Sequence, residues 1–183
     1  MTEEEKEIVE GCRKGDPASQ KRLYLDYGPM VKGICVRYTA DMQEAEDLFH
    51  DTFVYILTHF AGFDKISSLG GWLRKISINK AIDHIRKKKL HDVDTLSALD
   101  IDIRDTAARI NDTLTMEELT GFVNSLPDKY RSVFNLSVID GVPQDEICRL
   151  MGETSTNVRT LLSRARASLR KQIEKYLEKD NIL

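Results

Sequence analysis

The chain has 183 residues, with 27 Lys and Arg against 30 Asp and Glu, and its formal net charge is −3. Apolar residues make up 41% and charged residues 31%, a balance that supplies a core and excludes a disordered chain. The longest stretch without a charged side chain, Thr52 to Phe63, is shorter than the roughly 20 residues of a membrane span. The acidic start from Thr2 to Glu5 is unlike a cationic signal peptide. We therefore expect a cytoplasmic protein without membrane insertion.

Cysteine and histidine spacings indicate neither a metal site nor a disulfide framework. Cys12, Cys35 and Cys148 are far apart, and no CxxC pair exists. Asp47 and His50 have the spacing of half a di-metal carboxylate motif, but no other histidine has an acidic residue three positions before it. The enzyme motifs GxSxG, HExxH, GxxxxGK and GxGxxG are absent as well. We expect no catalytic residue, no metal and no cofactor, and we do not expect an enzyme.

The first half predicts three helices and shows no alternating strand pattern. Asp16 before Pro17 indicates an N-cap and a first helical position, and apolar residues then recur every three or four positions to Tyr38. Asp41, with a glutamate three positions later, starts a second helix to about position 59. Opposite its apolar stripe lies an acidic face, which is either solvated surface or a docking face for a basic partner. After a glycine-rich break, a third helix should run from Trp72 to about Lys89.

The net charge conceals a segregation along the chain. Residues 63–89 carry a net charge of +6 and residues 154–183 carry +4, whereas residues 90–118 carry −6. The two basic blocks favour nucleic-acid binding, because a local basic face matters more for phosphate contact than the total charge. The acidic block has few apolar residues in helical spacing, so we predict a linker over residues 90–112. The expected fold class is all-α, with small helical domains over residues 1–89 and 113–183.

The second half ends in a predicted helix-turn-helix. Two amphipathic helices come first, one ended by Pro127 and the other by Gly141–Pro143. A helix of two turns, Gln144 to Met151, then leads through Gly152 into a long helix from about Thr154. Such units place the start of the second helix in the major groove of DNA, where short polar residues and arginines suit base and phosphate contacts. The residues that we assign to this contact are Thr154, Ser155, Thr156, Asn157, Arg159, Thr160, Arg164 and Arg166.

Four stretches, in this order, resemble the extracytoplasmic-function (ECF) group of bacterial sigma factors over residues 10–175. They are Glu44–Phe53, Gly71–Arg86, Leu126–Phe134, and the segment from Gly152 through Ser163 and Arg166. Ser163 joins the expected DNA contacts through this resemblance. Two positions depart from the family pattern: Glu153 replaces the usual aliphatic residue after the turn glycine, and Leu161 stands where a polar or basic residue is common. Both affect the expected DNA contacts more than the fold.

The resemblance implies a transcription initiation factor that binds core RNA polymerase and promoter DNA. The acidic helix would dock on the clamp helices of the polymerase β′ subunit, and the C-terminal domain would contact the β flap and recognise the minus-thirty-five element. The expected polymerase-binding residues are Glu46, Asp47, His50, Asp51 and Phe53. The segment from Phe63 and the helix after it would open the minus-ten element, capturing unstacked bases with cationic and stacking groups. The residues expected in this opening are Trp72, Lys75, Asn79, Lys80, Asp83, Arg86 and Lys87.

Several alternatives stay open at this point. A lone tryptophan such as Trp72 is more often a core residue of a helical domain than a stacking platform. The linker would either thread the polymerase channels or serve as a soluble tether. The whole chain could instead be a stand-alone helix-turn-helix DNA-binding regulator, although such a regulator does not need the basic block at 63–89. An anti-sigma factor is a further partner that the resemblance allows.

Overall fold

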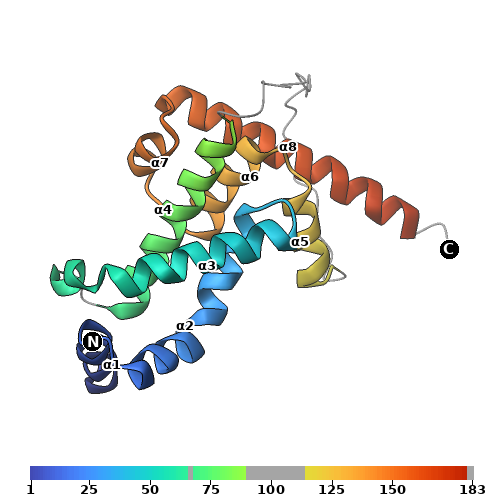
Figure 1. Ribbon diagram of the computed structural model, residues 1–183. Coiled ribbons are helices and arrows are strands. Elements are labelled where there is room, and N and C mark those ends of the chain that lie inside the picture. Colours follow the sequence, from blue (N-terminus) through green and yellow to red (C-terminus); the bar gives the residue numbers. More distant parts are fainter. Residues whose placement is uncertain (66–67, 90–113, 181–183) are drawn as a thin grey trace. The chain divides into compact units, whose positions relative to one another are not determined.

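The computed structural model describes residues 1–65, 68–89 and 114–180, and every regular element in these ranges is helical (Figure 1). The all-α class predicted from the sequence is thereby confirmed. The backbone forms two compact units, Met1–His84 and Ile85–Leu183, and each is described by itself. The predicted linker over residues 90–112 lies outside the described residues.

The first unit is built on four α-helices and a short 3₁₀ helix. They are α1 (Glu3–Arg13), α2 (Pro17–Tyr38), α3 (Met42–Thr58), η1 (Phe60–Lys65) and α4 (Leu69–Lys89), whose last turn continues beyond His84. Both predicted N-caps are confirmed: Asp16 accepts from the backbone N–H of Ser19 at 2.9 Å, and Asp41 accepts from that of Glu44 at 2.8 Å. Helix α4 starts at Leu69, earlier than predicted, and the hydroxyl of Ser68 accepts from the N–H of Gly71 in its first turn at 3.0 Å.

Helix α1 was not predicted from the sequence. It opens with a capping box, in which the Thr2 hydroxyl and the Glu5 carboxylate each accept from the other residue's backbone N–H, at 3.2 and 2.8 Å. Its side chains Ile8, Val9 and Cys12 are buried. Burial raises the pKa of the Cys12 thiol to about 11. The helix packs against α2, and is therefore part of the core of the first unit.

The apolar stripe of α3 is buried within the first unit. Helix α2 packs against this stripe, and each apolar side chain of the stripe stabilises the fold by about 1.5–3 kcal/mol when fully buried. The buried residues of α3 are Ala45, Leu48, Phe49, Thr52, Phe53 and Ile56. Since this stripe faces inward, Glu46, Asp47 and Asp51 of α3 are left on the surface.

Within residues 114–180, the second unit packs three short helices against one long one. They are α5 (Met116–Asn124), α6 (Asp128–Phe134) with its π-helical continuation η2 (Asn135–Ile139), α7 (Gln144–Met151), and the long helix α8 (Ser155–Asp180) (Figure 1). The core of the helix-turn-helix contains Ile147 of α7 and Val158 and Leu161 of α8, all of which are buried. Leu161 is therefore core, which explains its departure from a polar residue. Gly152 ends α7 in the left-handed region, with φ 66°, where glycine is favoured.

A buried arginine joins α5 to α6. The guanidinium of Arg131 donates to the backbone carbonyls of Asn124 at 2.8 Å and Leu126 at 3.4 Å, and to the carboxylate of Asp128 at 2.5 Å. These bonds satisfy carbonyl groups at the end of α5 that have no partner within their own helix. In the stretch Leu126–Phe134, which resembles the family, Asp128 and Arg131 therefore stabilise the turn between α5 and α6.

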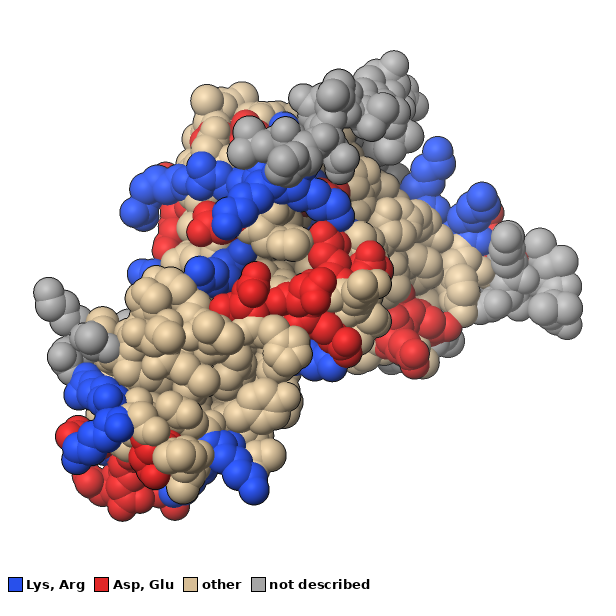
Figure 2. Space-filling view, viewed as in Figure 1, with Lys and Arg blue, Asp and Glu red and all other residues tan. Residues whose placement is uncertain are grey.

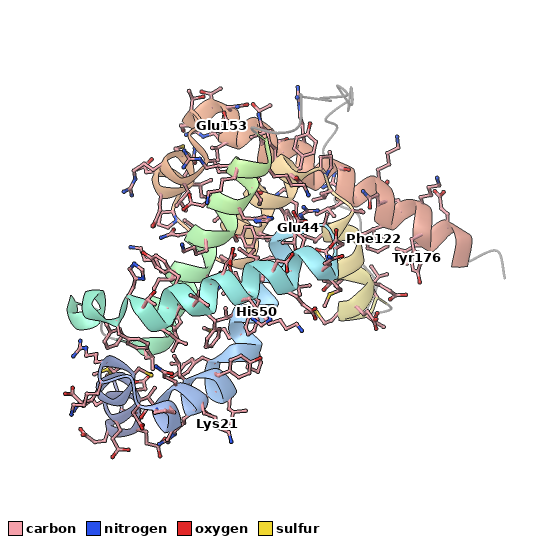
Figure 3. All side chains as sticks on the ribbon, in the orientation of Figure 1. Lys21, Glu44, His50, Phe122, Glu153 and Tyr176 are labelled. Atoms are coloured by element: carbon pink, nitrogen blue, oxygen red, sulfur yellow. The ribbon has the colours of Figure 1, made fainter. Side chains whose placement is uncertain are left out.

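The C-terminal half of α8 supports α5. The rings of Phe122 and Tyr176 meet edge to face, with centroids 5.5 Å apart (Figure 3), and the Ser125 hydroxyl donates to Gln172 at 2.7 Å. The Tyr176 hydroxyl also donates to the Glu118 carboxylate, a bond that holds the pKa of this carboxyl below its usual range. The later turns of α8 are therefore structural, and its first turns are the part available for a ligand.

Candidate nucleic-acid interface

The predicted polymerase face lies on α3. Glu46, Asp47, His50 and Asp51 are all exposed, as their spacing opposite the apolar stripe requires. Figure 2 shows acidic side chains gathered where Figure 1 places α3, and Figure 3 shows His50 on the same helix. The carboxylate of Glu46 also lies 3.3 Å from the ammonium group of Lys32. The structure therefore presents the four polar candidates together on one surface.

Phe53 is the exception among the polymerase candidates. Its side chain is only 5% exposed and lies in the core. Its ring is 5.1 Å from that of Tyr24, which is 49% exposed on α2 and is followed by Leu25, 61% exposed. The sequence analysis missed this apolar surface. The signal was the pair of apolar residues beside the stripe of α2, since only one side of a surface helix can be buried.

The predicted strand-opening residues lie on α4. Helical geometry turns successive residues by about 100°, which puts Lys75, Asn79 and Arg86 on one side of the helix with Asp83 and Lys87 beside them. Lys75, Asp83, Arg86 and Lys87 are exposed and Asn79 is half-buried. A cationic helix surface of this kind suits a phosphate backbone.

Among the strand-opening candidates, Trp72 and Lys80 make aromatic contacts within the protein. Trp72 is 5% exposed, with its ring 5.2 Å from Phe60 and 5.4 Å from Phe63. Of the two alternatives for Trp72, a core residue or a stacking platform, this burial supports the core residue. We therefore do not include Trp72 in the DNA surface. The Lys80 ammonium lies 3.7 Å from the centre of the Tyr55 ring, against which it makes a cation–π contact. Its role in strand opening stays a prediction.

The start of α8 is organised by its own polar side chains. The Thr154 hydroxyl accepts from the N–H of Asn157 at 3.2 Å, and Gln144 of α7 donates to the Ser155 hydroxyl at 2.7 Å. The Thr160 hydroxyl donates to the backbone carbonyl of Thr156 at 3.0 Å. Three of the predicted hydroxyl contacts therefore already hold protein partners.

The cationic candidates of α8 stand clear of the core. Arg159, Arg164 and Arg166 are exposed, and Ser163 is half-buried beside them. Arg159 lies in the second turn of the helix, and the other two arginines lie one to two turns later. This order agrees with base contacts at the start of the helix and phosphate contacts farther along, as helix-turn-helix docking requires.

Glu153, the family departure at the turn, has a partner on each carboxylate oxygen. Oε2 accepts from Nδ2 of Asn157 at 2.5 Å, and Oε1 lies 3.5 Å from Nζ of Lys129 on α6 (Figure 3 labels Glu153). An unpaired carboxylate at this position would repel DNA phosphate. Lys129 balances its charge, and the contact between positions so far apart in the sequence has no sequence signal.

Other kinds of site find no support in the described ranges. Across residues 1–65, 68–89 and 114–180, no three His, Cys, Asp or Glu side chains gather as metal ligands. In the same ranges no helix is long and apolar enough to cross a membrane.

Both units match known families. A family model described as Sigma-70 region 2 matches residues 23–91, and one described as Sigma-70, region 4 matches residues 116–169. The ECF RNA polymerase sigma factor SigW of Bacillus subtilis is 28% identical, over 92% of this chain and 96% of that protein. The RNA polymerase sigma-H factor of Pseudomonas aeruginosa is 26% identical, over 96% of each.

A solved structure agrees with these matches. The sigma factor RpoE from Bartonella quintana, crystallised in complex with the anti-sigma factor NepR, shares the fold with a TM-score of 0.54 at 22% identity. The similarity covers 84% of this chain and 96% of that one. The two family models match separate parts of the chain, and the relatives match along nearly the whole chain. The chain therefore belongs to the sigma-70 family, as a sigma factor of the ECF group.

Proposed function

We propose that this sigma factor binds core RNA polymerase, directs it to a specific set of promoters and initiates transcription there. One observation carries the proposal. An exposed acidic helix face, a basic helix and a helix-turn-helix with an exposed basic start occur in a single chain that matches regions 2 and 4 of the family. Each of these surfaces suits one step of initiation.

The N-terminal domain would serve docking and strand opening. The acidic face of α3 suits the clamp helices of the polymerase β′ subunit, since complementary charges speed encounter and set orientation. The basic side of α4, with Lys75, Arg86 and Lys87 exposed, suits the minus-ten element once its bases unstack. We assign residues 1–89 to this domain.

The second unit would recognise the upstream promoter element. Helix α8 would enter the major groove of the minus-thirty-five element with its first two turns, and Arg164 and Arg166 would lie along the backbone. Contact with the polymerase β flap would place this domain upstream. We assign residues 113–183 to it and residues 90–112 to an acidic linker.

Other features of the proposal follow from this role. The sigma factor would act in the cytoplasm and carry no enzymatic activity of its own, because the polymerase supplies the chemistry. An anti-sigma factor is a further partner, which the similarity to the RpoE of the RpoE–NepR complex supports. The function of a stand-alone regulator is not favoured, because it does not account for the match to Sigma-70 region 2.

One experiment tests the proposal directly. The purified full chain is added to bacterial core polymerase on a library of double-stranded promoter fragments, and transcripts are sequenced. We expect initiation at a restricted set of sequences with the chain, and none of it with core polymerase alone. Sequence-specific DNA binding by the chain without any initiation would overturn the proposal in favour of the stand-alone regulator.

A further inference from the structure

The hydrogen bond between Glu153 and Asn157 limits what Asn157 can offer to DNA. A carboxylate at neutral pH only accepts hydrogen bonds, whereas an amide has one accepting oxygen and two N–H donors. The side chain of Asn157 must therefore turn its nitrogen toward Glu153, as the contact from Nδ2 to Oε2 has it. The amide orientation is fixed by this chemistry. Its oxygen, Oδ1, and the second N–H of the amide are left for other partners.

The same carboxylate is held from its other side. Oε1 of Glu153 lies 3.5 Å from the ammonium group of Lys129, and the two side chains are only 20% and 27% exposed. Two partners on two oxygens restrict the carboxylate to one position. The backbone N–H of Asn157 is likewise engaged, by the Thr154 hydroxyl. Asn157 therefore projects from a fixed backbone with a fixed amide.

We propose that Glu153 is a positioning residue for promoter specificity, which makes Asn157 present an accepting oxygen to the major groove. This inference rests on the proposed function, because it requires α8 to lie in the groove. An acceptor there needs a donor, and the exocyclic amines of adenine and cytosine are the donors of the major groove. Asn157 then selects an amino base, adenine or cytosine, over a keto base at one strand position of the upstream element.

The inference explains why Glu153 stands where the family usually has an aliphatic residue. An aliphatic residue after the turn glycine cannot accept from the amide, so the amide could turn either its oxygen or its nitrogen to the groove. With Glu153 in place the nitrogen is held on the Glu153 side, so the groove is offered the oxygen and at most one N–H beside it, and the preference shifts toward bases that donate. Lys129 limits the repulsion between Glu153 and the DNA phosphates, because it balances the charge of the carboxylate before the DNA binds.

The test uses the holoenzyme, reconstituted from the full chain and bacterial core polymerase, on promoters with a randomised upstream element. The Asn157→Ala variant identifies the base pair that Asn157 reads, as the position where its preference is lost. At this position the exocyclic amine is then removed, by purine in place of adenine or 2-pyrimidinone in place of cytosine. We expect this removal to weaken wild-type binding about five- to tenfold, within the range of a lost base contact.

Glu153 variants separate positioning from folding. Glu153→Ala should make the holoenzyme nearly indifferent to the amine at that position while leaving the preference at other positions intact. Glu153→Gln still offers an accepting oxygen to Asn157, so it should restore the sensitivity to the amine. Asp145→Ala removes an exposed carboxylate of α7 and serves as the matched control, with no change at the Asn157 position.

The outcomes distinguish this inference from the proposed function. Absence of promoter-specific initiation by the wild type overturns both. Specific initiation in which amine removal costs wild type and Glu153→Ala equally overturns the inference alone, as does an Asn157→Ala variant with unchanged preference at every position. A loss of binding to all sequences alike in Glu153→Ala, without rescue by Glu153→Gln, would mean that the residue only supports the fold.

Discussion

Nε2 of His84 lies 2.8 Å from Oε1 of Glu44, and this contact ties α4 to the first turn of α3. The other oxygen of Glu44 accepts from the backbone N–H of Ala40 at 3.0 Å, before the N-cap of α3. One carboxylate thus holds the α2–α3 turn, the start of α3 and α4. Because α3 carries the proposed polymerase face and α4 the proposed strand-opening face, the contact fixes each of these surfaces relative to the other.

Loss of this contact should destabilise the first unit modestly. The side chains of His84 and Glu44 are 32% and 15% exposed, so solvent screens part of the interaction. We expect His84→Ala to lower the free energy of unfolding of the full chain by about 1 kcal/mol in urea titrations. His50→Ala, an exposed histidine on α3, is the control and should change it little. Equal effects of the two substitutions would contradict a specific role of the pair.

Charge reversal on α3 should abolish polymerase binding without unfolding the helix. In the variant Asp47→Lys, Asp51→Lys both changes lie on the exposed face, so helical content by circular dichroism should stay as in the wild type. Association with core polymerase, measured by gel filtration or fluorescence anisotropy, should be lost because the complementary charge is inverted. The matched control reverses Glu3 and Glu10, which are exposed on α1, and should bind normally. Retained binding by a folded α3 variant would refute the docking assignment.

How far the sequence could go is clear from particular elements. Asp16 and Asp41 correctly predicted the starts of α2 and α3, because a helix N-cap depends only on residues that are neighbours in the sequence. Thr2 and Glu5 have the spacing of a capping box as well, and this spacing could have predicted α1. The fold class and the helix-turn-helix were therefore within reach of the sequence.

The candidate site was less predictable, because its decisive contacts join distant residues. Trp72 was assigned to DNA although its aromatic neighbours Phe60 and Phe63 bury it, and that burial depends on how η1 folds over α4. The charge of Glu153 is balanced by Lys129, which lies on another helix. No periodicity or spacing in the sequence reports such pairs.

A methyl group at Gly11 should disrupt the packing of α1 on α2. A Cβ there would lie 1.9 Å from Oγ and 2.5 Å from Cβ of Ser19, closer than real contacts allow. We expect Gly11→Ala to destabilise the protein by about 1–3 kcal/mol in thermal or urea unfolding. Ser19→Gly should offset the loss in the double variant, because it removes both clashing atoms. Gly33→Ala, with open space around its Cβ, is the control; a loss there as large as at Gly11 would argue against the close approach.

Strand opening should depend on the exposed lysines of α4. Lys75→Ala with Lys87→Ala removes two exposed charges while sparing Lys80, whose contact with Tyr55 supports the fold. We expect polymerase binding to persist and permanganate reactivity of unpaired thymines in the promoter complex to rise more slowly, because the exposed strand loses cationic partners. Lys21→Ala on α2 (Figure 3) is the control for a lost surface charge. Normal strand opening by the α4 variant would contradict this role, and the basic residues of α4 would then have another function.

The arginines of α8 should divide by role along the helix. Arg159, in the second turn, can reach base edges, whereas Arg166, two turns later, lies along the backbone. Arg159→Ala should therefore change which upstream element the holoenzyme prefers, by about 1–3 kcal/mol if a bidentate contact is lost. Arg166→Ala should weaken binding to all promoters alike and reduce the salt slope of log affinity by about 0.9, because one phosphate contact fewer releases one counterion fewer. Affinities of each holoenzyme for several upstream sequences across a salt series decide the matter. The division is wrong if Arg159→Ala lowers every affinity equally while Arg166→Ala alters the sequence preference.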